Sequence, residues 1–403
     1  MVPPMHTLTI KPSVARRATD GRAGLSGLRH QARRYLPAAL YHYVEGAAED
    51  EVASKRNDAS FREYAFLPRV LKDVSARSYS KSVFGFDYRL PFGIAPMGSA
   101  RIIAQDGDIA LARAAESAGI PFILSGASLT PMEDVRKAGF NTWFQAYIPG
   151  ETDRIAALVD RVEAAGFDTL VITADTAVHP KHERAARHGF TFPVRPSAAL
   201  AWQGMTRPKW LWRTILRDRM SGMKFCFENM DAGRGPPIFS SKLVRDIGRR
   251  DALSWAHVEI VRRRWKGKLA IKGVMASEDA QIAAESGVDG IIVSNHGGRQ
   301  INCAASSLEA LRRISNLNLP VTLMLDGGIR RGSDVLTALR LGADFVFVGR
   351  PMLFAAAVGG QQGVHEAIDL LAEEIDISMA LLGVTDFEAL RDVEVVSDRR
   401  NAV

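Results

Sequence analysis

A histidine and an arginine three residues apart are the side chains of this chain best suited to acid–base chemistry on an anion. His296 and Arg299 lie in the run SNHGGRQ, residues 294–300, which directly follows the apolar stretch 290–293. Histidine can accept a proton near neutral pH, and a guanidinium can hold a carboxylate through two parallel hydrogen bonds. The two glycines allow the backbone to approach a flat ligand closely. We therefore predict a site that takes a proton from an anionic molecule.

Short apolar runs alternate with amphipathic segments along the chain, the pattern of repeated strand–helix units. Segments that predict helices follow most of the runs, and several end at a glycine suited to a helix C-terminus; they are 110–119, 154–166, 277–287, 307–314 and 331–341. The eight predicted strands are 92–96, 121–125, 142–147, 169–175, 269–274, 290–296, 321–327 and 345–350. Eight such units predict an α/β fold, a closed (β/α)₈ barrel.

Polar residues stand at or near the ends of the predicted strands, where barrels of this kind carry their chemistry. They are Ser125, Gln145, Tyr147, Thr173, Asp175, Lys272, Ser294, His296, Asp326 and Arg350. A strand buried on both faces has little use for a lysine or an aspartate unless a pocket needs it. Asp175 could also be an ordinary helix N-cap, whereas a lysine at a barrel mouth needs an anionic partner.

Two turns after the last predicted strands are suited to a phosphate. The sequence DGGIRRG, residues 326–332, follows the seventh strand, and Gly349-Arg350-Pro351 follows the eighth. Backbone amides and guanidinium groups at these two positions commonly hold phosphate in such barrels. The chain has no P-loop and no convincing GxGxxG motif, which argues against a Rossmann nucleotide site.

A long interruption, about residues 191–250, separates the fourth and fifth strands. It carries three tryptophans at 202, 210 and 212 among several arginines and lysines. It is expected to be an insertion over the active face, and two interpretations are open: a packed flap, favoured here, or an interfacial patch of aromatics beside cations.

Composition narrows the class of protein. The chain has 403 residues, a net charge of +7 and 47% hydrophobic residues, as expected for a soluble globular protein. Its basic residues are dispersed, which favours an anionic ligand or surface over nucleic acid. Only two cysteines occur, Cys226 and Cys303, so no disulfide framework is expected and a cytoplasmic location is the natural one.

No run approaches the roughly 20 apolar residues that span a bilayer, and the N-terminus has no apolar signal core. We therefore expect no export by that route. The predicted organisation is an N-terminal extension over 1–32, which could be disordered, and a barrel domain over 33–403 that contains the insertion.

Taken together, these motifs resemble those of the FMN-dependent α-hydroxy acid oxidases and dehydrogenases, a family that includes glycolate oxidase, lactate oxidase and mandelate dehydrogenase. The resemblance runs from about Arg33 to the C-terminal region. Its segments are Leu36-Pro37, YHYVEGAAED at 41–50, WFQAY at 143–147, Thr173-Ala174-Asp175, IKGV at 271–274, SNHGGRQ, DGGIRRG and Gly349-Arg350-Pro351.

The resemblance implies oxidation of a 2-hydroxy acid to a 2-oxo acid, with flavin N5 as the electron acceptor and a role for each matching residue. His296 would be the base and Asp175 would stabilise its protonated ring. Lys272 would stabilise the charge that develops on the reduced flavin. Substrate would be bound by Tyr43, Tyr147, His182 and Arg299, although Tyr43 could equally be a core residue. FMN would be bound by Pro96, Met97, Gly98, Ser125, Gln145, Thr173, Lys272, Ser294, Asp326, Gly328, Arg330, Gly349 and Arg350.

The chain departs from the family in the segment after the fourth strand. A second substrate-binding arginine is usual there, and this chain has His182, with His179 and His188 nearby. Three explanations are open: Lys181 or Arg184 substitutes for the arginine, a protonated His182 binds the anion, or the substrate is atypical. We favour an atypical substrate. Spacing also allows a metal site on the three histidines, but the family uses no metal and none is expected.

A second departure concerns the electron acceptor. Gly98 stands where oxidases of the family commonly carry alanine and membrane mandelate dehydrogenases carry glycine. This favours a dehydrogenase that passes electrons to a quinone or a protein rather than to O₂, with possible peripheral membrane contact through the insertion.

The resemblance implies a homotetramer as well. Two other functions remain open: oxidation of an amine or of a large hydroxylated biosynthetic intermediate, and a flavin barrel without redox activity that acts as an isomerase or a scaffold.

Overall fold

Eight parallel strands close into a barrel in the computed structural model, which describes residues 24–191, 193–240 and 249–397. Neighbouring strands around the barrel follow the order β10-β11-β4-β5-β6-β7-β8-β9. The strands are β4 (Phe92–Ile94), β5 (Phe122–Ser125), β6 (Thr142–Ala146), β7 (Thr169–Thr173), β8 (Lys268–Val274), β9 (Gly290–Val293), β10 (Thr322–Asp326) and β11 (Phe345–Val348). The predicted fold and all eight predicted strands are confirmed, although most strands end a few residues earlier than predicted. At these ends the chain turns into the loops of the site.

Helices cover the outside of the barrel, and the five helices predicted from sequence are all present. The helices between strands include α4 (Ala100–Ile103), α5 (Gly107–Ala118), α6 (Met132–Ala138), α7 (Thr152–Ala164), α12 (Trp255–Arg264), α13 (Ser277–Glu285), α14 (Ser307–Ser315) and α15 (Gly332–Arg340). Their apolar faces and the outward side chains of the strands form one continuous buried core.

The barrel interior is a separate, largely aromatic core. Trp143, Met324, Phe345 and Phe347 from three strands fill it. A hairpin of β2 (Lys81–Val83) and β3 (Phe86–Tyr88) packs against this core, and the indole N–H of Trp143 donates to the Tyr88 hydroxyl at 3.1 Å. One end of the barrel is thereby filled, so a ligand can enter only at the other end, where the strands have their carboxyl termini.

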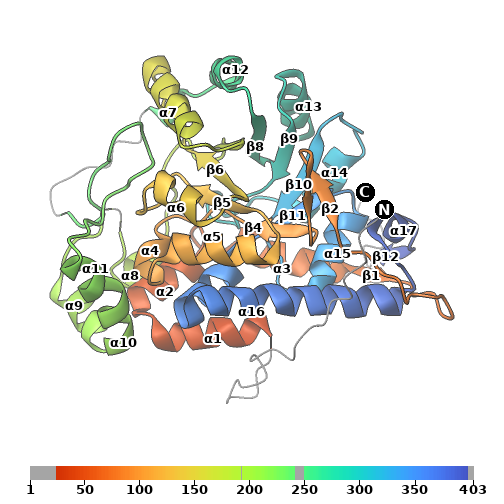
Figure 1. Ribbon diagram of the computed structural model, residues 1–403, viewed down its shortest axis with the longest axis horizontal. Coiled ribbons are helices and arrows are strands. Elements are labelled where there is room, and N and C mark those ends of the chain that lie inside the picture. Colours follow the sequence, from red (N-terminus) through yellow and green to blue (C-terminus); the bar gives the residue numbers. More distant parts are fainter. Residues whose placement is uncertain (1–23, 192, 241–248, 398–403) are drawn as a thin grey trace.

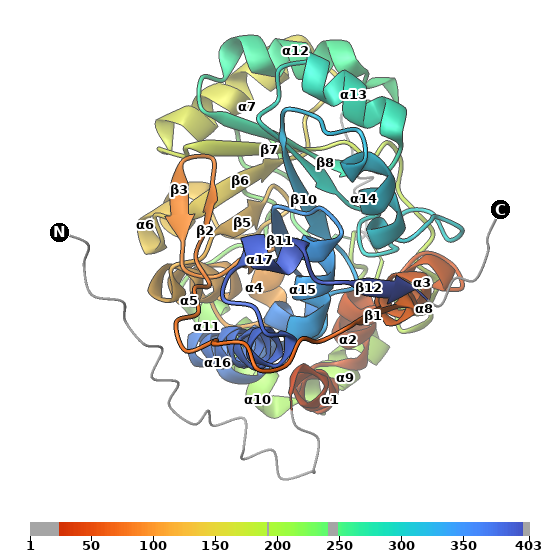
Figure 2. The same ribbon diagram turned by 90° about the vertical axis from the view of Figure 1, so that its right-hand side faces the viewer.

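The two ends of the chain pack side by side outside the barrel (Figures 1 and 2). The N-terminal elements are α1 (Leu25–Tyr35), α2 (Ala38–Glu45), α3 (Val52–Ser60), a 3₁₀ turn (Phe61–Glu63) and β1 (Tyr64–Phe66). The C-terminal elements are the long α16 (Arg350–Leu382), kinked at Gly360, then α17 (Phe387–Arg391) and β12 (Val395–Ser397). Strand β12 pairs with β1, and α1 packs on α16. Part of the predicted extension is thus a packed helix, while residues 1–23 lie outside the described residues.

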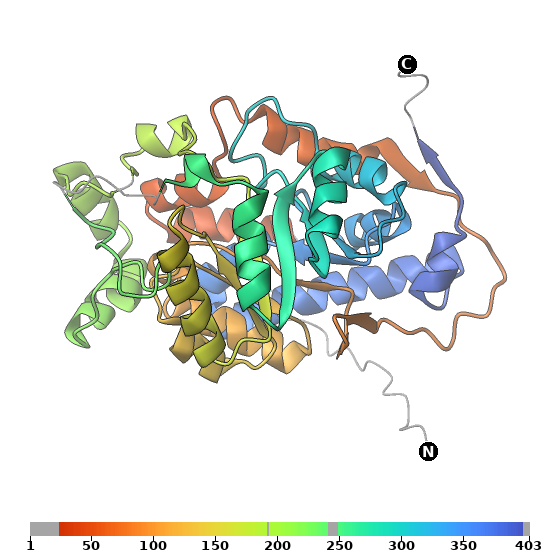
Figure 3. The ribbon, with the colours of Figure 1, turned by 90° about the horizontal axis from the view of Figure 1, so that it is seen from above.

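The segment between β7 and β8 projects from one side of the barrel (Figure 3). It contains α8 (Glu183–Arg187), α9 (Ala198–Met205), α10 (Pro208–Trp210), a π-helical turn (Leu211–Leu216), α11 (Arg217–Met220) and the 3₁₀ turn η4 (Arg250–Ala252). A buried ion pair at 2.7 Å joins Asp218 of α11 to Arg101 of α4. The segment is therefore attached to the barrel through α4.

One tryptophan of this segment fits the packed flap predicted from the sequence, and two fit the interfacial patch. Trp210 is buried, and its indole N–H donates to the carbonyl of Ile102 at 3.0 Å, as a packed flap requires. Trp202 and Trp212 are 64% and 58% exposed. Throughout the described part of the chain, no helix has the length and apolar character needed to cross a membrane.

Candidate active site

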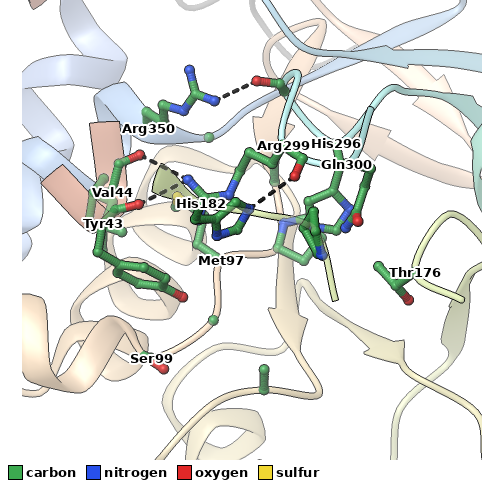
Figure 4. Close-up of a pocket in the computed structure, with 18 of the residues that line it drawn as sticks. Tyr43, Val44, Met97, Ser99, Thr176, His182, His296, Arg299, Gln300 and Arg350 are labelled. Atoms are coloured by element: carbon green, nitrogen blue, oxygen red, sulfur yellow. Dashed lines mark hydrogen bonds between the residues drawn. The ribbon is translucent and has the colours of Figure 1, made fainter. Parts of the chain in front are cut away.

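A cavity of about 450 Å³ opens at the carboxyl ends of the barrel strands (Figure 4). Fourteen of the predicted site residues line it: Tyr43, Pro96, Met97, Gly98, Tyr147, His182, Lys272, His296, Arg299, Asp326, Gly328, Arg330, Gly349 and Arg350. The other predicted residues, Ser125, Gln145, Thr173, Asp175 and Ser294, are not part of the lining, but Asp175 contacts His296 and Ser294 contacts Lys272. The structure therefore gathers the predicted site around one space.

His296 is held by a carboxylate and by an unusual backbone conformation. Its Nδ1 lies 2.9 Å from Oδ1 of Asp175, so Nδ1–H donates to the carboxylate and Nε2 is left to accept a proton. His296 has a φ of 57°, in the left-handed region that few residues other than glycine adopt. Such strain is retained where the surrounding structure fixes a functional side chain.

Gly273 allows Asp175 to reach this position. Gly273 has a φ of 103°, and a Cβ there would lie 2.7 Å from the Cβ of Asp175. Burial opposes ionisation of Asp175, but His296 and Lys272 outweigh it and lower its pKa. The carboxylate is therefore charged near neutral pH.

Lys272 is the buried cation of the strand ends, with a side chain only 3% exposed. Its Nζ lies 3.1 Å from Oδ2 of Asp326 and donates to Oγ of Ser294 at 2.9 Å. Ser294 in turn donates to Asp326. Burial works against the ammonium, but Asp326 and Asp175 outweigh it and raise the pKa of Lys272. Lys272 therefore keeps its charge in this cavity.

Arg299 is oriented by the end of helix α2. Its guanidinium donates to the carbonyls of Tyr43, at 2.9 Å, and of Gly46, and lies 5.2 Å from the centre of the Tyr43 ring. Figure 4 shows Arg299 bonded to the backbone carbonyls of Tyr43 and Val44, beside His296. Burial lowers the pKa of Arg299, as expected for a guanidinium in a site that favours an anion.

His182 is a neutral group in this structure. Its Nε2 lies 3.0 Å from the backbone carbonyl of Arg299, so Nε2–H donates to that oxygen. Burial and the charge of Arg299 lower the pKa of His182 to about 4. His182 is thus uncharged near neutral pH, which argues against binding of an anion by a protonated ring.

The neighbouring cations are directed elsewhere. Lys181 is 76% exposed and pairs with Glu183 at 3.1 Å, and Arg184 pairs with Glu51 at 2.9 Å. Neither residue lines the cavity. The local substitutes considered from sequence therefore do not supply the second cation.

Arg330 and Arg350 form a cationic end of the cavity. Arg350 donates to Oγ of Ser54 at 3.0 Å and to the carbonyl of Gly297, and Arg330 pairs with Asp58 at 3.1 Å. Burial and the charges of Arg330 and Arg299 lower the pKa of Arg350 to about 9. A bound anion such as phosphate would stabilise the charge of Arg350 beside Arg330.

Gln145 offers a hydrogen-bond donor at the opposite side. Its carbonyl Oε1 accepts from Ser125 at 3.2 Å and from the backbone of Gly126 at 3.3 Å. Its amide Nε2 is buried and has no hydrogen-bond partner among the described residues. A buried donor of this kind is satisfied by a ligand acceptor.

Sequence reasoning missed Arg250, Phe190 and Phe227, which also line the cavity. All three belong to the segment between β7 and β8, where no periodic sequence pattern predicts which way a side chain points. The only local signal for Arg250 is its place just before the helix that leads into β8, and that signal is weak.

The histidines predicted as a conceivable metal site do not converge. The ring of His188 stacks on His42 at 3.8 Å, while His182 contacts Arg299. Across the described residues, no group of three or more histidine, cysteine or carboxylate side chains could hold a metal ion.

Comparison with known proteins agrees with this geometry. The profile of the FMN-dependent dehydrogenases matches residues 32–397. The chain belongs to this family. It is 36% identical to an L-lactate dehydrogenase of Ectopseudomonas mendocina, over 95% of this chain and 99% of that protein. It is also 36% identical to the (S)-mandelate dehydrogenase of Pseudomonas putida, over 89% of this chain and 90% of that protein.

A solved structure described as the monotopic membrane protein (S)-mandelate dehydrogenase superimposes with a TM-score of 0.81. The two are 34% identical over 92% of this chain and 98% of that chain. The protein is therefore an FMN-dependent α-hydroxy acid dehydrogenase or oxidase, and its cofactor is FMN.

The residues around the cavity fit FMN. The pair Arg330 and Arg350 fits the phosphate, and the free amide of Gln145 fits a flavin ring acceptor. Gly98 belongs to the wall, where a Cβ would lie 3.0 Å from the Cβ of Ala127. An alanine there would press on that neighbour, so the glycine keeps the wall recessed.

Proposed function

We propose that the protein oxidises a 2-hydroxy acid to the 2-oxo acid, with His296 as the base that takes a proton from the substrate. The observation that carries the proposal is the 2.9 Å contact between His296 and Asp175 at the edge of the cavity. A carboxylate beside Nδ1 fixes the tautomer and stabilises the ring once it is protonated.

The remaining residues are assigned by their chemistry. Arg299 and the phenols of Tyr43 and Tyr147 would bind the substrate, and Lys272 would stabilise negative charge. FMN would be held by the predicted cofactor residues, with its phosphate at Arg330 and Arg350. Oxidation of the alcohol releases two protons and two electrons; His296 would take one proton, and bound FMN would accept the two electrons together with the other proton.

We propose further that the substrate is not a simple small 2-hydroxy acid. The neutral His182, and the engagement of Lys181 and Arg184 elsewhere, support this. An amine or a large hydroxylated intermediate is the alternative substrate, and an isomerase or scaffold without redox activity is the alternative role.

The proposed electron acceptor is a quinone or a protein, supported by Gly98, with O₂ as the alternative.

A membrane surface is the proposed site of this electron transfer. The exposed apolar side chains Trp202, Met205, Trp212, Leu216 and Met220 lie on the projecting helices α9 to α11 with exposed Lys209, Arg213 and Arg217. Aromatics beside cations favour an anionic lipid surface. Sedimentation with anionic vesicles should remove the wild type from solution and leave a Trp202→Ser/Trp212→Ser variant behind. Equal sedimentation of the two would contradict this contact.

A cytoplasmic homotetramer, attached peripherally to the membrane, remains our proposal for location and assembly. Light scattering of the purified protein gives the subunit number directly.

The test of the reaction is the visible spectrum of the holoenzyme under argon. We expect (S)- or (R)-2-hydroxy acids to bleach the flavin and air to restore it slowly. Rapid reoxidation with stoichiometric peroxide would make the enzyme an oxidase. Bleaching by glycolate, lactate or mandelate at roughly 1 to 10³ per second would contradict an atypical substrate. Flavin that amines bleach and hydroxy acids do not would favour the alternative substrate.

A further inference from the structure

Arg250 reaches the active-site cavity from the end of the segment between β7 and β8. It begins the turn η4, is 6% exposed, and lines the cavity. Its guanidinium carbon lies 4.6 Å from the centre of the Tyr147 ring, which follows β6. Burial raises the pKa of Tyr147, and the charge of Arg250 opposes that rise. Arg250 therefore acts electrostatically on a residue assigned to substrate binding.

The cavity contains a second pair of the same kind. Arg299 lies 5.2 Å from the centre of the Tyr43 ring and is anchored to α2. Arg299 follows β9, whereas Tyr147 follows β6, and strands β7 and β8 stand between those two strands in the barrel. Two guanidinium–phenol pairs thus approach the cavity from separate supports. Each combines a cation with a hydroxyl donor, which is a combination suited to a carboxylate.

The charges of the lining residues also favour an anionic substrate. Among the described lining residues, Arg250, Lys272, Arg299, Arg330 and Arg350 are permanent cations, and Asp326 is the single carboxylate. Asp326 pairs with Lys272. With the FMN phosphate at Arg330 and Arg350, Arg250 and Arg299 are the other two guanidiniums of this lining. A buried lining whose charges are mainly cationic favours an anionic ligand.

We propose that Arg250, together with Tyr147, binds a second acidic group of the substrate, so that the substrate is a 2-hydroxy acid with two acidic groups. Arg299 and Tyr43 then bind the carboxylate next to the reacting carbon. This inference rests on the proposed oxidation of a 2-hydroxy acid and specifies the class of substrate.

The experiment compares two compounds of equal chain length, 2-hydroxyglutarate and 2-hydroxypentanoate, each as both enantiomers. Flavin reduction is followed under argon in the wild-type holoenzyme, Arg250→Gln and Arg249→Gln. Arg249 is the adjacent exposed arginine, so its variant makes the same charge change outside the cavity. We expect the wild type and Arg249→Gln to prefer the diacid at least tenfold in kcat/KM. Arg250→Gln should lose about 10²-fold on the diacid and less than threefold on the monoacid.

Three results in this experiment overturn the proposal. An equal loss on both compounds places Arg250 at the carboxylate they share, and no loss on either removes Arg250 from substrate binding. Wild-type preference for the monoacid excludes a second acidic group.

A binding measurement separates this proposal from the reaction itself. Glutarate and pentanoate are titrated into the oxidised holoenzyme, and the shift of the flavin spectrum gives each Kd. We expect glutarate to bind the wild type at least tenfold more tightly, and Arg250→Gln to abolish that difference. This outcome would support the acidic subsite even if no hydroxy acid reduced the flavin, which would contradict only the proposed reaction. Equal Kd values for the two compounds in the wild type would overturn the subsite.

Discussion

The two halves of the cavity hold their charges in different ways. At the strand ends, Lys272, Ser294 and Asp326 bond to one another, and Asp175 bonds to His296. On the side formed between β7 and β8, His182 is neutral and Arg250 contacts a ring. A connected network of buried charges fixes a reacting geometry, whereas separate side chains on an irregular segment can alter substrate choice without disturbing it. We expect changes in the first half to remove the reaction and changes in the second to redirect it.

Replacing the base should produce the largest loss. His296→Asn keeps a polar side chain but cannot act as a base at this position, so flavin reduction by a 2-hydroxy acid should slow about 10³-fold or more. Stopped-flow spectra under argon measure the rate. FMN content should stay at the wild-type level, and a variant with full FMN and an unchanged rate would remove His296 from the chemistry.

Removing the buried cation should cost less. Lys272→Met leaves Asp326 charged and without its ammonium, so we expect roughly 10²-fold slower flavin reduction together with weaker FMN retention. The matched control is Lys272→Met/Asp326→Asn, which removes both charges. If the double variant recovers FMN content but not rate, the cation itself is required; recovery of both would assign Lys272 a purely structural role.

Moving the carboxylate of Asp175 should slow flavin reduction less than removing the ammonium of Lys272. Gly273→Ala places a Cβ 2.7 Å from that of Asp175, and we expect flavin reduction to fall roughly tenfold, since a positioning error of this order weakens catalysis. Gly166→Ala is the control, because Gly166 also has a positive φ, of 81°, but its Cβ would meet nothing within 4 Å. Equal effects of the two changes on rate would show that backbone strain alone is responsible.

The smallest effect concerns pH and the stacked histidines beside the β7–β8 segment. Burial and the charge of His188 lower the pKa of His42 from 6.5 to about 4. The folded state therefore favours neutral His42, and this stability is complete above pH 6.5 and is lost as pH falls toward 4. Because the His42 ring is only partly buried, we expect its contribution to the free energy of unfolding to be about 1 kcal/mol or less. This corresponds to about 2 °C in Tm.

Thermal melts of the wild type and His42→Phe between pH 7 and 4 measure this contribution. The phenylalanine keeps an aromatic ring against His188 and cannot titrate, so its Tm should fall less. If Tm falls equally with pH in the two proteins, the lowered pKa of His42 is contradicted.

Local sequence patterns predicted the barrel because they report on burial residue by residue. The run 290–293 is apolar and buried throughout, and the polar residues that follow it leave the strand at the barrel mouth. The same rule placed Lys272, Asp326 and Tyr147 at one end of the fold, since parallel strands finish on the same side. The resemblance to a known family then supplied their roles.

Sequence alone determined the eight strands, the residues at their ends and the loss of the usual arginine at position 182. Tertiary structure alone decided that His182 is neutral, that Arg299 is anchored to α2, and that Arg250 enters beside Tyr147. The physical reason is that strand periodicity is a local property of the chain. The pKa of a buried ring, and the meeting of a guanidinium with a phenol from a distant strand, depend on contacts that exist only after the chain has folded.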